Sequence, residues 1–303
     1  MGNKRIEYAL LVLLAALWGS SYLALKIAVR ELPPITTIAA RVSIAAVILV
    51  AILYARGDRL PADKLTWRNL FVQSFFSATA SWPLLAWGAQ RIDSSLAGVL
   101  NSTSPIWVFF ITLFITRHEK LTWLKFAGAA GGMLGVATVI GWSPAGSAGA
   151  DTLGQAAAVA SAMLYACAAV WGTRYSGASV TSVAAGTMVW SSVCLLPLSL
   201  LIEAPWTLRP SNEALLATLY LGVVTTAATM MLYFRLVKTL GSLGVASQAY
   251  LRAGWSVFLG AVFLGEAFTL QIMIGLAGIV LAVTAINAGR EAPTRPGPRP
   301  SSR

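Results

Sequence analysis

The stretch "SLGVASQAYLRAGWSVFLGAVFLGEAFT", Ser242–Thr269, decides the fold, because an earlier part of the chain matches it. Moved back by 147 residues, it lies without a gap on "SLAGVLNSTSPIWVFFITLFITRHEKLT", Ser95–Thr122. The same register continues on both sides and pairs Trp18 with Tyr165, Thr79 with Thr226, Asn101 with Gln248, Glu119 with Glu266, Thr122 with Thr269, Gly128 with Gly275 and Gly131 with Gly278. A chance match of small residues would not align acidic, hydroxyl and amide side chains together. The chain is therefore predicted to contain two related halves.

The composition places both halves in a membrane. Of the 303 residues, 57% are hydrophobic and only 11% are charged, which is too apolar for a soluble domain of this length. Apolar runs of about 17 to 25 residues are long enough to cross a bilayer as helices. They predict ten spans near residues 6–29, 35–54, 69–89, 95–116, 122–142, 153–173, 180–202, 213–236, 243–264 and 269–288. The fold class is an all-α integral membrane protein.

Five spans in each half give an odd number, so the second half enters the membrane in the opposite sense from the first. The predicted architecture is two inverted-topology five-helix repeats, an arrangement typical of secondary transporters. The first repeat covers residues 1–142 and the second covers residues 153–289, with a hinge loop at 143–152 between them. The Pro-rich basic segment 290–303 is predicted to be a disordered cytoplasmic tail.

The cations are distributed unequally between the two sides of the membrane. With an inside N-terminus, sixteen of the 22 Lys and Arg lie on the cytoplasmic side, four lie on the other side, and Arg41 and Arg252 lie within spans. This positive-inside bias predicts a multi-pass protein of a bacterial-type cytoplasmic (inner) membrane with both termini in the cytoplasm. The net charge of +11 therefore indicates topology rather than a nucleic-acid partner.

Three motifs carry a family resemblance that extends over nearly the whole chain. They are "LWGSSY" at Leu17–Tyr22, "PPITTIAAR" at Pro33–Arg41 and "FLGEAFTLQIMIGLAGIVLAV" at Phe263–Val283. Together with ten spans in tandem halves, they resemble the EamA-type drug/metabolite transporters, and most closely the YddG-type exporters. The resemblance implies export of amino acids, notably aromatic ones. One departure is that the repeat mate of Pro105 is Arg252, where family members usually have proline in both halves.

Arg252 is the strongest candidate for contact with a substrate. It lies about ten residues into its predicted span, hence about 15 Å deep at 1.5 Å per residue. An isolated arginine at a helix centre costs roughly 2.5 to 3.5 kcal/mol, so this side chain must face a polar interior or water. Helical spacing places it on one stripe with Gln248 and Trp255. We expect Arg252 to receive the carboxylate of a zwitterionic substrate, or partly to set the potential of the cavity. The alternatives are that it satisfies carbonyls of a broken helix or extends to one leaflet.

The repeat supplies further candidates, since matched polar positions should face each other near the midplane. The candidate substrate-binding residues are Arg252, Gln248, Asn101, Thr79, Trp82, Thr226, Thr229, Trp18 and Tyr165. Hydrogen bonding between helices or core packing would account for the amides, threonines and rings equally well. Arg41 is predicted to have a structural role, capping carbonyls or anchoring its helix to headgroups. Glu119 and Glu266 are expected to cap the helices that follow them, through Thr122 and Thr269 or through the helix dipole.

Missing features narrow the function. No carboxylate falls at mid-membrane, which argues against a cationic drug exchanged for protons. There is no phosphate-binding Gly-Lys-Ser/Thr loop and no clustered Asp, Glu or His, so we expect no catalytic residues, no metal, no cofactor and no use of ATP. An integral-membrane enzyme of lipid chemistry, a channel, and an exporter of other drugs or metabolites remain as alternatives.

The sequence therefore predicts a secondary transporter or facilitator. It would export amino acids, aromatic ones included, or related small metabolites by alternating access at a central cavity. Its partners would be the small-molecule substrate and the lipid bilayer. A monomer is the expected form, although glycine-rich faces such as Gly128–Gly135 would also suit a dimer.

Overall fold

The computed structural model describes residues 4–115, 123–140, 150–175, 179–233, 235–236, 248–267 and 269–288. Within these ranges the regular structure is entirely helical and contains no strand. The predicted all-helical fold class is thus confirmed for the described part of the chain. The tail at 290–303, most of the hinge loop at 143–152, and Glu119 lie outside the described residues.

The first part of the chain contains five successive helical segments, two of which are divided into shorter helices. In order, they are α1 (Lys4–Ala28), α2 (Pro34–Ala55), α3 (Lys64–Ser74) with the π-helix η1 (Phe75–Thr79) and α4 (Ser81–Ala89), α5 (Ser94–Asn101) with α6 (Ser104–Phe114), and α7 (Trp123–Ile140). The second part contains α8 (Ala150–Gly172) with the 3-10 helix η2 (Thr173–Tyr175), α9 (Val180–Ile202), the 3-10 helix η3 (Pro205–Thr207), α10 (Asn212–Gly222) with the π-helix η4 (Val223–Ala228), α12 (Gln248–Leu264) and α13 (Leu270–Ala288).

Helix length and composition agree with a multi-pass membrane protein. Six helical stretches of the described chain are long and apolar enough to cross a bilayer: Arg5–Ala28, Pro34–Ala55, Ser94–Phe114, Thr152–Tyr175, Val180–Ile202 and Asn212–Tyr233. Shorter apolar helices cover Phe126–Gly135, Leu251–Leu264 and Ile272–Ala282, where three more spans were predicted. The predicted span 69–89 is interrupted by η1 and so does not form one continuous α-helix.

Two of the predicted spans are broken beside a proline. Pro83 follows η1 and has no backbone N–H to bond the carbonyl of Thr79, four residues earlier. Pro105 stands at the start of α6, and the chain turns between Asn101 and Ser104. The proline ring would clash with the carbonyl of Asn101 in a continuous helix.

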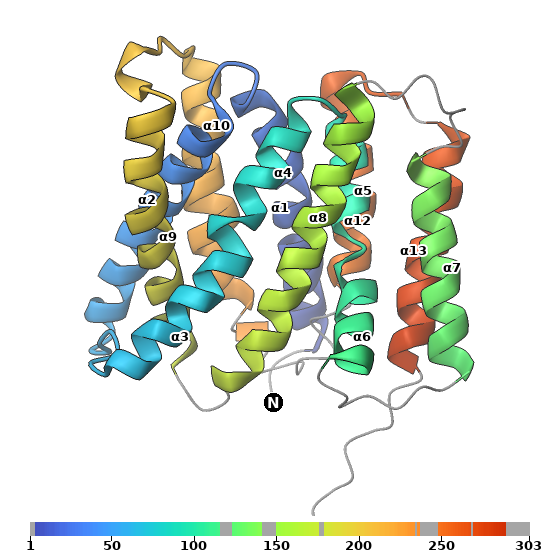
Figure 1. Ribbon diagram of the computed structural model, residues 1–303, viewed down its shortest axis with the longest axis horizontal. Helices are drawn as coiled ribbons and strands as arrows, with labels where there is room; N and C mark the ends of the chain where they lie inside the picture. Colours follow the sequence, from blue (N-terminus) through green and yellow to red (C-terminus); the bar gives the residue numbers. More distant parts are fainter. Residues whose placement is uncertain are drawn as a thin grey trace, which may run out of the picture.

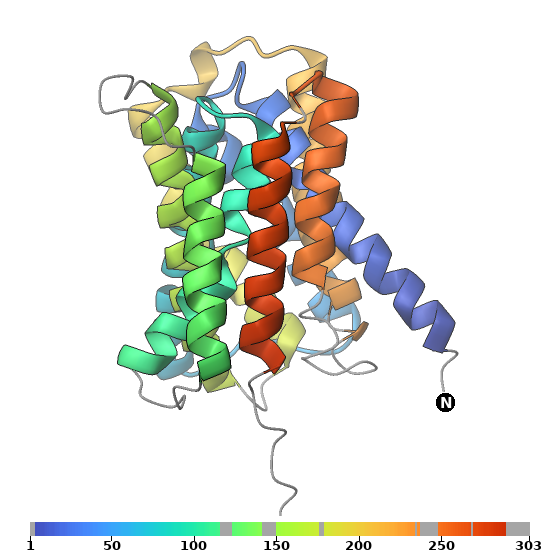
Figure 2. The ribbon, with the colours of Figure 1, turned by 90° about the vertical axis from the view of Figure 1, so that its right-hand side faces the viewer.

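The helices run side by side in one bundle (Figure 1). Helices α2 and α9 lie along one edge, α7 and α13 lie along the opposite edge, and α1, α4, α5, α8 and α12 lie between them. The α7–α13 pair stands in front in the turned view (Figure 2). It packs closely at Gly135, where a Cβ atom would lie 3.0 Å from the Gly275 carbonyl oxygen and 3.0 Å from the Ile279 nitrogen. Small residues thus permit the close helix contact that is common in membranes.

Three glutamates tie the bundle together at the end opposite the N-terminus, and we call them the carboxylate caps. Each accepts hydrogen bonds at the start of a helix in the other half of the chain. Glu203 binds the Ile35 and Thr36 nitrogens at 3.1 and 2.6 Å, Glu31 binds the Ser211 nitrogen at 2.6 Å and its Oγ at 2.8 Å, and Glu266 binds the Ser94 and Ser95 nitrogens at 2.7 and 2.9 Å and also the Ser95 hydroxyl. A carboxylate there satisfies free N–H groups and complements the helix dipole.

The role of Glu266 differs from the prediction. It was expected to cap the helix that follows it, yet it caps α5. Thr269, which was expected to take part in capping the following helix, does cap the start of α13: its Oγ1 accepts from the Ile272 nitrogen at 3.3 Å. Sequence adjacency suggested the wrong partner, because the start of α5 reaches the end of α12 only in the folded bundle.

Candidate functional site

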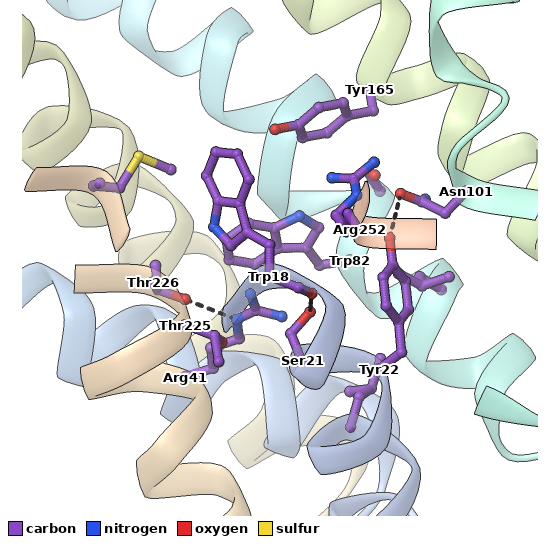
Figure 3. A pocket seen from close by; sticks show the side chains of 14 residues that line it. Trp18, Ser21, Tyr22, Arg41, Trp82, Asn101, Tyr165, Thr225, Thr226 and Arg252 are labelled. Atoms are coloured by element: carbon purple, nitrogen blue, oxygen red, sulfur yellow. Dashed lines mark hydrogen bonds between the residues drawn. The ribbon is translucent and has the colours of Figure 1, made fainter. Parts of the chain in front are cut away.

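A polar cavity lies inside the bundle among α1, α2, α4, α5, α8, η4 and α12 (Figure 3). Its lining consists of Trp18, Ser21, Tyr22, Leu25, Arg41, Ser81, Trp82, Leu85, Asn101, Tyr165, Thr225, Thr226, Met230 and Arg252. The free volume is about 50 Å³, enough for a few water molecules. A larger solute would require the helices to separate.

Arg41 enters the cavity from α2, about 10 Å along that helix from its start at Pro34. Its side chain is 7% exposed. Its Nε donates to Thr226 Oγ1 over 3.0 Å, and its guanidinium carbon lies 4.0 Å from the centre of the Trp82 ring. This cation–π contact and the hydrogen bond fix the plane of the guanidinium. The prediction that Arg41 caps carbonyls or reaches headgroups does not describe this position.

The partner of Arg41 is itself held by the local backbone. Thr226 lies in the π-helix η4, where its Oγ1 donates to the Leu221 carbonyl at 2.8 Å. The lone pairs of the hydroxyl then remain available to accept from the arginine. The wider turn of η4 thus places a threonine acceptor in the cavity.

Arg252 enters the cavity from α12 and is 9% exposed. Its Nε is buried and has no hydrogen-bond partner among the described residues. Helix α12 lies directly against α1: a Cβ at Gly19 would be 2.6 Å from Trp255 Cβ and 3.0 Å from the Arg252 carbonyl oxygen. The close packing positions the arginine backbone, while the side-chain donor is left free for a ligand or water.

Aromatic rings and one amide complete the lining. Trp18 Nε1 donates to Thr229 Oγ1 over 2.9 Å. The Tyr22 hydroxyl donates to Asn101 Oδ1 over 3.1 Å, and Asn101 Nδ2 lies 3.4 Å from Ser161 Oγ. Figure 3 shows both arginines, the indoles of Trp18 and Trp82, and the Tyr165 ring gathered around the same space.

Six of the nine residues proposed from the sequence line this cavity: Trp18, Trp82, Asn101, Tyr165, Thr226 and Arg252. The other three lie outside its lining. Thr79 bonds Ser74 at 2.9 Å and Ser191 at 3.3 Å, and Thr229 supports Trp18. Gln248 is buried one turn before Arg252, and its Oε1 has no partner among the described residues.

Asn101, which was expected to face Gln248 across the midplane, accepts from the Tyr22 hydroxyl and lies within bonding distance of Ser161. Trp255, expected on the same stripe as Arg252, packs edge-on against Phe258, with ring centres 5.6 Å apart, and does not line the cavity. The repeat register identifies equivalent positions but not the direction in which each side chain points.

Sequence reasoning missed Arg41, Tyr22 and the small hydroxyl residues Ser21, Ser81 and Thr225. A signal for Arg41 was present, because it is an arginine within an apolar span, the same criterion that selected Arg252. The hydroxyl residues gave no such signal, since serine and threonine are common in membrane helices.

The chemistry of the cavity follows from its lining. Two guanidinium groups, which are always donors and never acceptors, face it, and none of its described lining residues is acidic. Aromatic and aliphatic side chains supply the remaining surface. The arrangement suits an anionic group attached to an apolar body. The described residues contain no group of three His, Cys, Asp or Glu able to hold a metal ion.

Comparison with known proteins gives the family. The model of the EamA-like transporter family matches residues 5–141 and again residues 152–288, together most of the chain. The chain is 25% identical over 284 residues to the uncharacterized inner membrane transporter YedA of Escherichia coli, covering 93% of this chain and 91% of YedA. It is 23% identical to the uncharacterized transporter YoaV of Bacillus subtilis, with coverages of 86% and 89%, and 23% identical to protein PagO of Salmonella typhimurium, with 96% of each chain covered.

One solved crystal structure has the same fold. It superposes with a TM-score of 0.66 at 20% sequence identity, covering 92% of this chain and 96% of the other. Because the family model matches both halves of the chain, this protein belongs to the EamA-like transporter family.

Proposed function

We propose that this EamA-family transporter exports small carboxylate-bearing metabolites, amino acids and aromatic amino acids among them, by alternating access at the central cavity. It acts as a secondary transporter or facilitator with the monomer as the transporting unit. The solute crosses chemically unchanged, so no enzymatic step is involved. Exporters of other drugs or metabolites in the same superfamily are the competing assignment.

The observation that carries the proposal is Arg252 in the cavity, more than nine-tenths buried, with an Nε that has no partner in the described chain. A buried donor without a partner costs about 1 to 3 kcal/mol, which an incoming acceptor group recovers. Carboxylates form strong charge-assisted bonds with guanidinium groups. Arg41 adds a second cation to the same lining, and none of the lining residues is acidic.

The architecture proposed for this cycle is ten spans in two inverted repeats. Two matches of one family model support the repeat. The positions of the π-helices η1 and η4 in the two halves support it as well. The shift of 147 residues moves η1 onto residues 222–226, where η4 lies in the other half. Both halves thus carry a π-helix at overlapping repeat positions.

The proposed location is the bacterial inner membrane with both termini in the cytoplasm. The relative YedA is named as an inner membrane transporter, which supports the inner-membrane location. The positive-inside distribution of Lys and Arg supports the orientation of the termini. Cysteine labelling at each terminus of the protein in intact cells tests the orientation.

Transport assays test the function itself. Purified protein in liposomes is given a panel of labelled amino acids, organic acids, sugars and cations, and the transported solute is identified by mass spectrometry. We expect carboxylate-bearing solutes to cross unchanged and Arg252→Ala to abolish their transport. Arg174→Ala is the matched control, because Arg174 is exposed and also stacks on an indole, with its guanidinium carbon 3.8 Å from the Trp171 ring centre. Normal transport by a folded Arg252→Ala protein, or transport of cations or sugars alone, contradicts the proposal.

A further inference from the structure

We propose that the preferred solute is a net anion, an aromatic or apolar carboxylate without an ammonium group, rather than the zwitterionic amino acid of the same size. This inference rests on the proposed function and refines its substrate class. It follows from the balance of charges and of hydrogen-bond donors and acceptors in the cavity.

The cavity carries two fixed positive charges and no negative one in its described lining. Arg41 and Arg252 are each more than nine-tenths buried, and a guanidinium keeps its proton in proteins. A monoanionic solute partly neutralises this charge. A zwitterion leaves the total unchanged and brings a third cation into the same confined space.

The ammonium of a zwitterion would find only neutral oxygen acceptors in the described lining, and several of these already take part in hydrogen bonds. Asn101 Oδ1 already accepts from the Tyr22 hydroxyl. The hydroxyl of Ser81 is engaged with Ser161 at 2.9 Å, and that of Ser21 bonds the Trp18 carbonyl at 2.6 Å. An ammonium that loses its water in this cavity would gain no carboxylate partner, which makes its desolvation costly.

The carboxylate, in contrast, meets donors that lack acceptors. The Nε of Arg252 is unpaired in the described chain. Arg41, whose Nε bonds Thr226, lines the same cavity as a second cation. A carboxylate offers about four acceptor sites and no donor. The donors of the site and the acceptors of an organic anion are therefore complementary.

The rings define the other end of the solute. Trp18, Trp82, Tyr165 and Tyr22 line the cavity with Leu25, Leu85 and Met230. Such a wall binds an aromatic or branched apolar body by area and by ring contacts. An anion with a phenyl group is accordingly a suitable probe.

The test uses three probes that share one phenyl body. Phenylpyruvate carries a carboxylate alone, phenylalanine carries a carboxylate and an ammonium, and phenethylamine carries an ammonium alone. Binding to the wild-type protein in detergent and counterflow in liposomes are measured for all three. We expect phenylpyruvate to bind at least about tenfold more tightly than phenylalanine, which is about 1.4 kcal/mol, and phenethylamine to bind least.

Variants assign the preference to the cavity. Arg41→Gln and Arg252→Gln should each reduce the ratio of phenylpyruvate to phenylalanine affinity, whereas Arg174→Gln should leave it unchanged. Equal affinities for phenylpyruvate and phenylalanine, or tighter binding of phenylalanine, overturn the inference and leave the proposed function standing. Preference for phenethylamine overturns both. Because the wild-type comparison needs no variant, the outcome does not depend on whether an arginine variant folds.

Discussion

The two buried arginines face the same cavity but are held in different ways. Arg41 is fixed by a hydrogen bond to Thr226 and by the ring of Trp82. Arg252 is buried to a similar extent, yet its Nε has no partner in the described chain. Arg41 is thus held in one position as a fixed charge. Arg252 keeps a hydrogen-bond donor that is free to bind the solute. The difference suggests that Arg41 sets the potential of the cavity and that Arg252 makes the contact that changes on binding.

The largest effect is expected for Arg252→Gln. This change removes a charged donor that has no other partner, and hydrogen bonds to charged groups contribute about 1.5 to 3 kcal/mol. The affinity for a carboxylate solute should fall about 10- to 150-fold, as measured by titration of the purified protein. A greater loss in Arg41→Gln than in Arg252→Gln would reverse the proposed division of roles.

Arg41→Lys should have an intermediate effect. Lysine keeps the charge but loses the planar fork, the bond to Thr226 and most of the stacking on Trp82. We expect the affinity to fall about 5- to 30-fold, from about 1 to 2 kcal/mol of lost positioning. Arg252→Lys is the matched comparison and should lose less, because the Nε of Arg252 has no hydrogen bond in the described chain to lose. The same loss in both lysine variants would show that Arg41 is not preorganised.

A smaller effect is expected for Thr226→Val. Valine keeps the shape of the side chain and removes the hydroxyl, which accepts from Arg41 Nε and donates to the Leu221 carbonyl. Affinity should fall about fivefold, near 1 kcal/mol. Thr218→Val serves as the control, since Thr218 is also buried but bonds only the Ala214 carbonyl, at 2.9 Å, within its own helix. Unchanged solute binding in Thr226→Val would mean that Trp82 alone fixes Arg41.

The smallest effect should come from pH. Both cavity cations are arginines, which stay charged across the physiological range. Phenylpyruvate binding should therefore stay constant within about twofold between pH 6 and 8 in calorimetric titrations. A change in phenylpyruvate affinity within that pH range would reveal another ionising group at the site. The two arginines would then not be the only charges that determine binding.

Much of the fold follows from the sequence, because burial of apolar residues in a bilayer demands long apolar runs. The predicted spans near 6–29, 35–54 and 180–202 are α1, α2 and α9 with little change at their ends. The breaks within 69–89 and 95–116 depend on Pro83 and Pro105, whose effect on a membrane helix varies with its neighbours. Hydrophobicity alone therefore did not reveal them.

The candidate site was predictable only where an energetic penalty marks a residue. Arg252 stood out because a charged side chain deep in a membrane costs free energy unless polar groups or water surround it. Thr79 and Gln248 were chosen from repeat register, which does not specify the face of a helix, and neither lines the cavity. Arg41 was assigned a structural role, because its direction toward Trp82 and Thr226 depends on packing with α4 and η4, which the sequence does not show.

The three carboxylate caps make the two ends of the bundle unequal. By the shift of 147 residues, the positions matching Glu31 and Glu203 are Ala178 and Arg56, so two of the three caps have no counterpart at the other end. In the proposed cycle, an opening at the capped end that separates the two halves would uncover the N-termini of α2, α5 and α10, and water would replace the carboxylates there. Because opening this end costs several hydrogen bonds, we expect little leakage of solute between turnovers. We also expect the empty transporter to be accessible mostly from the end that bears the N-terminus.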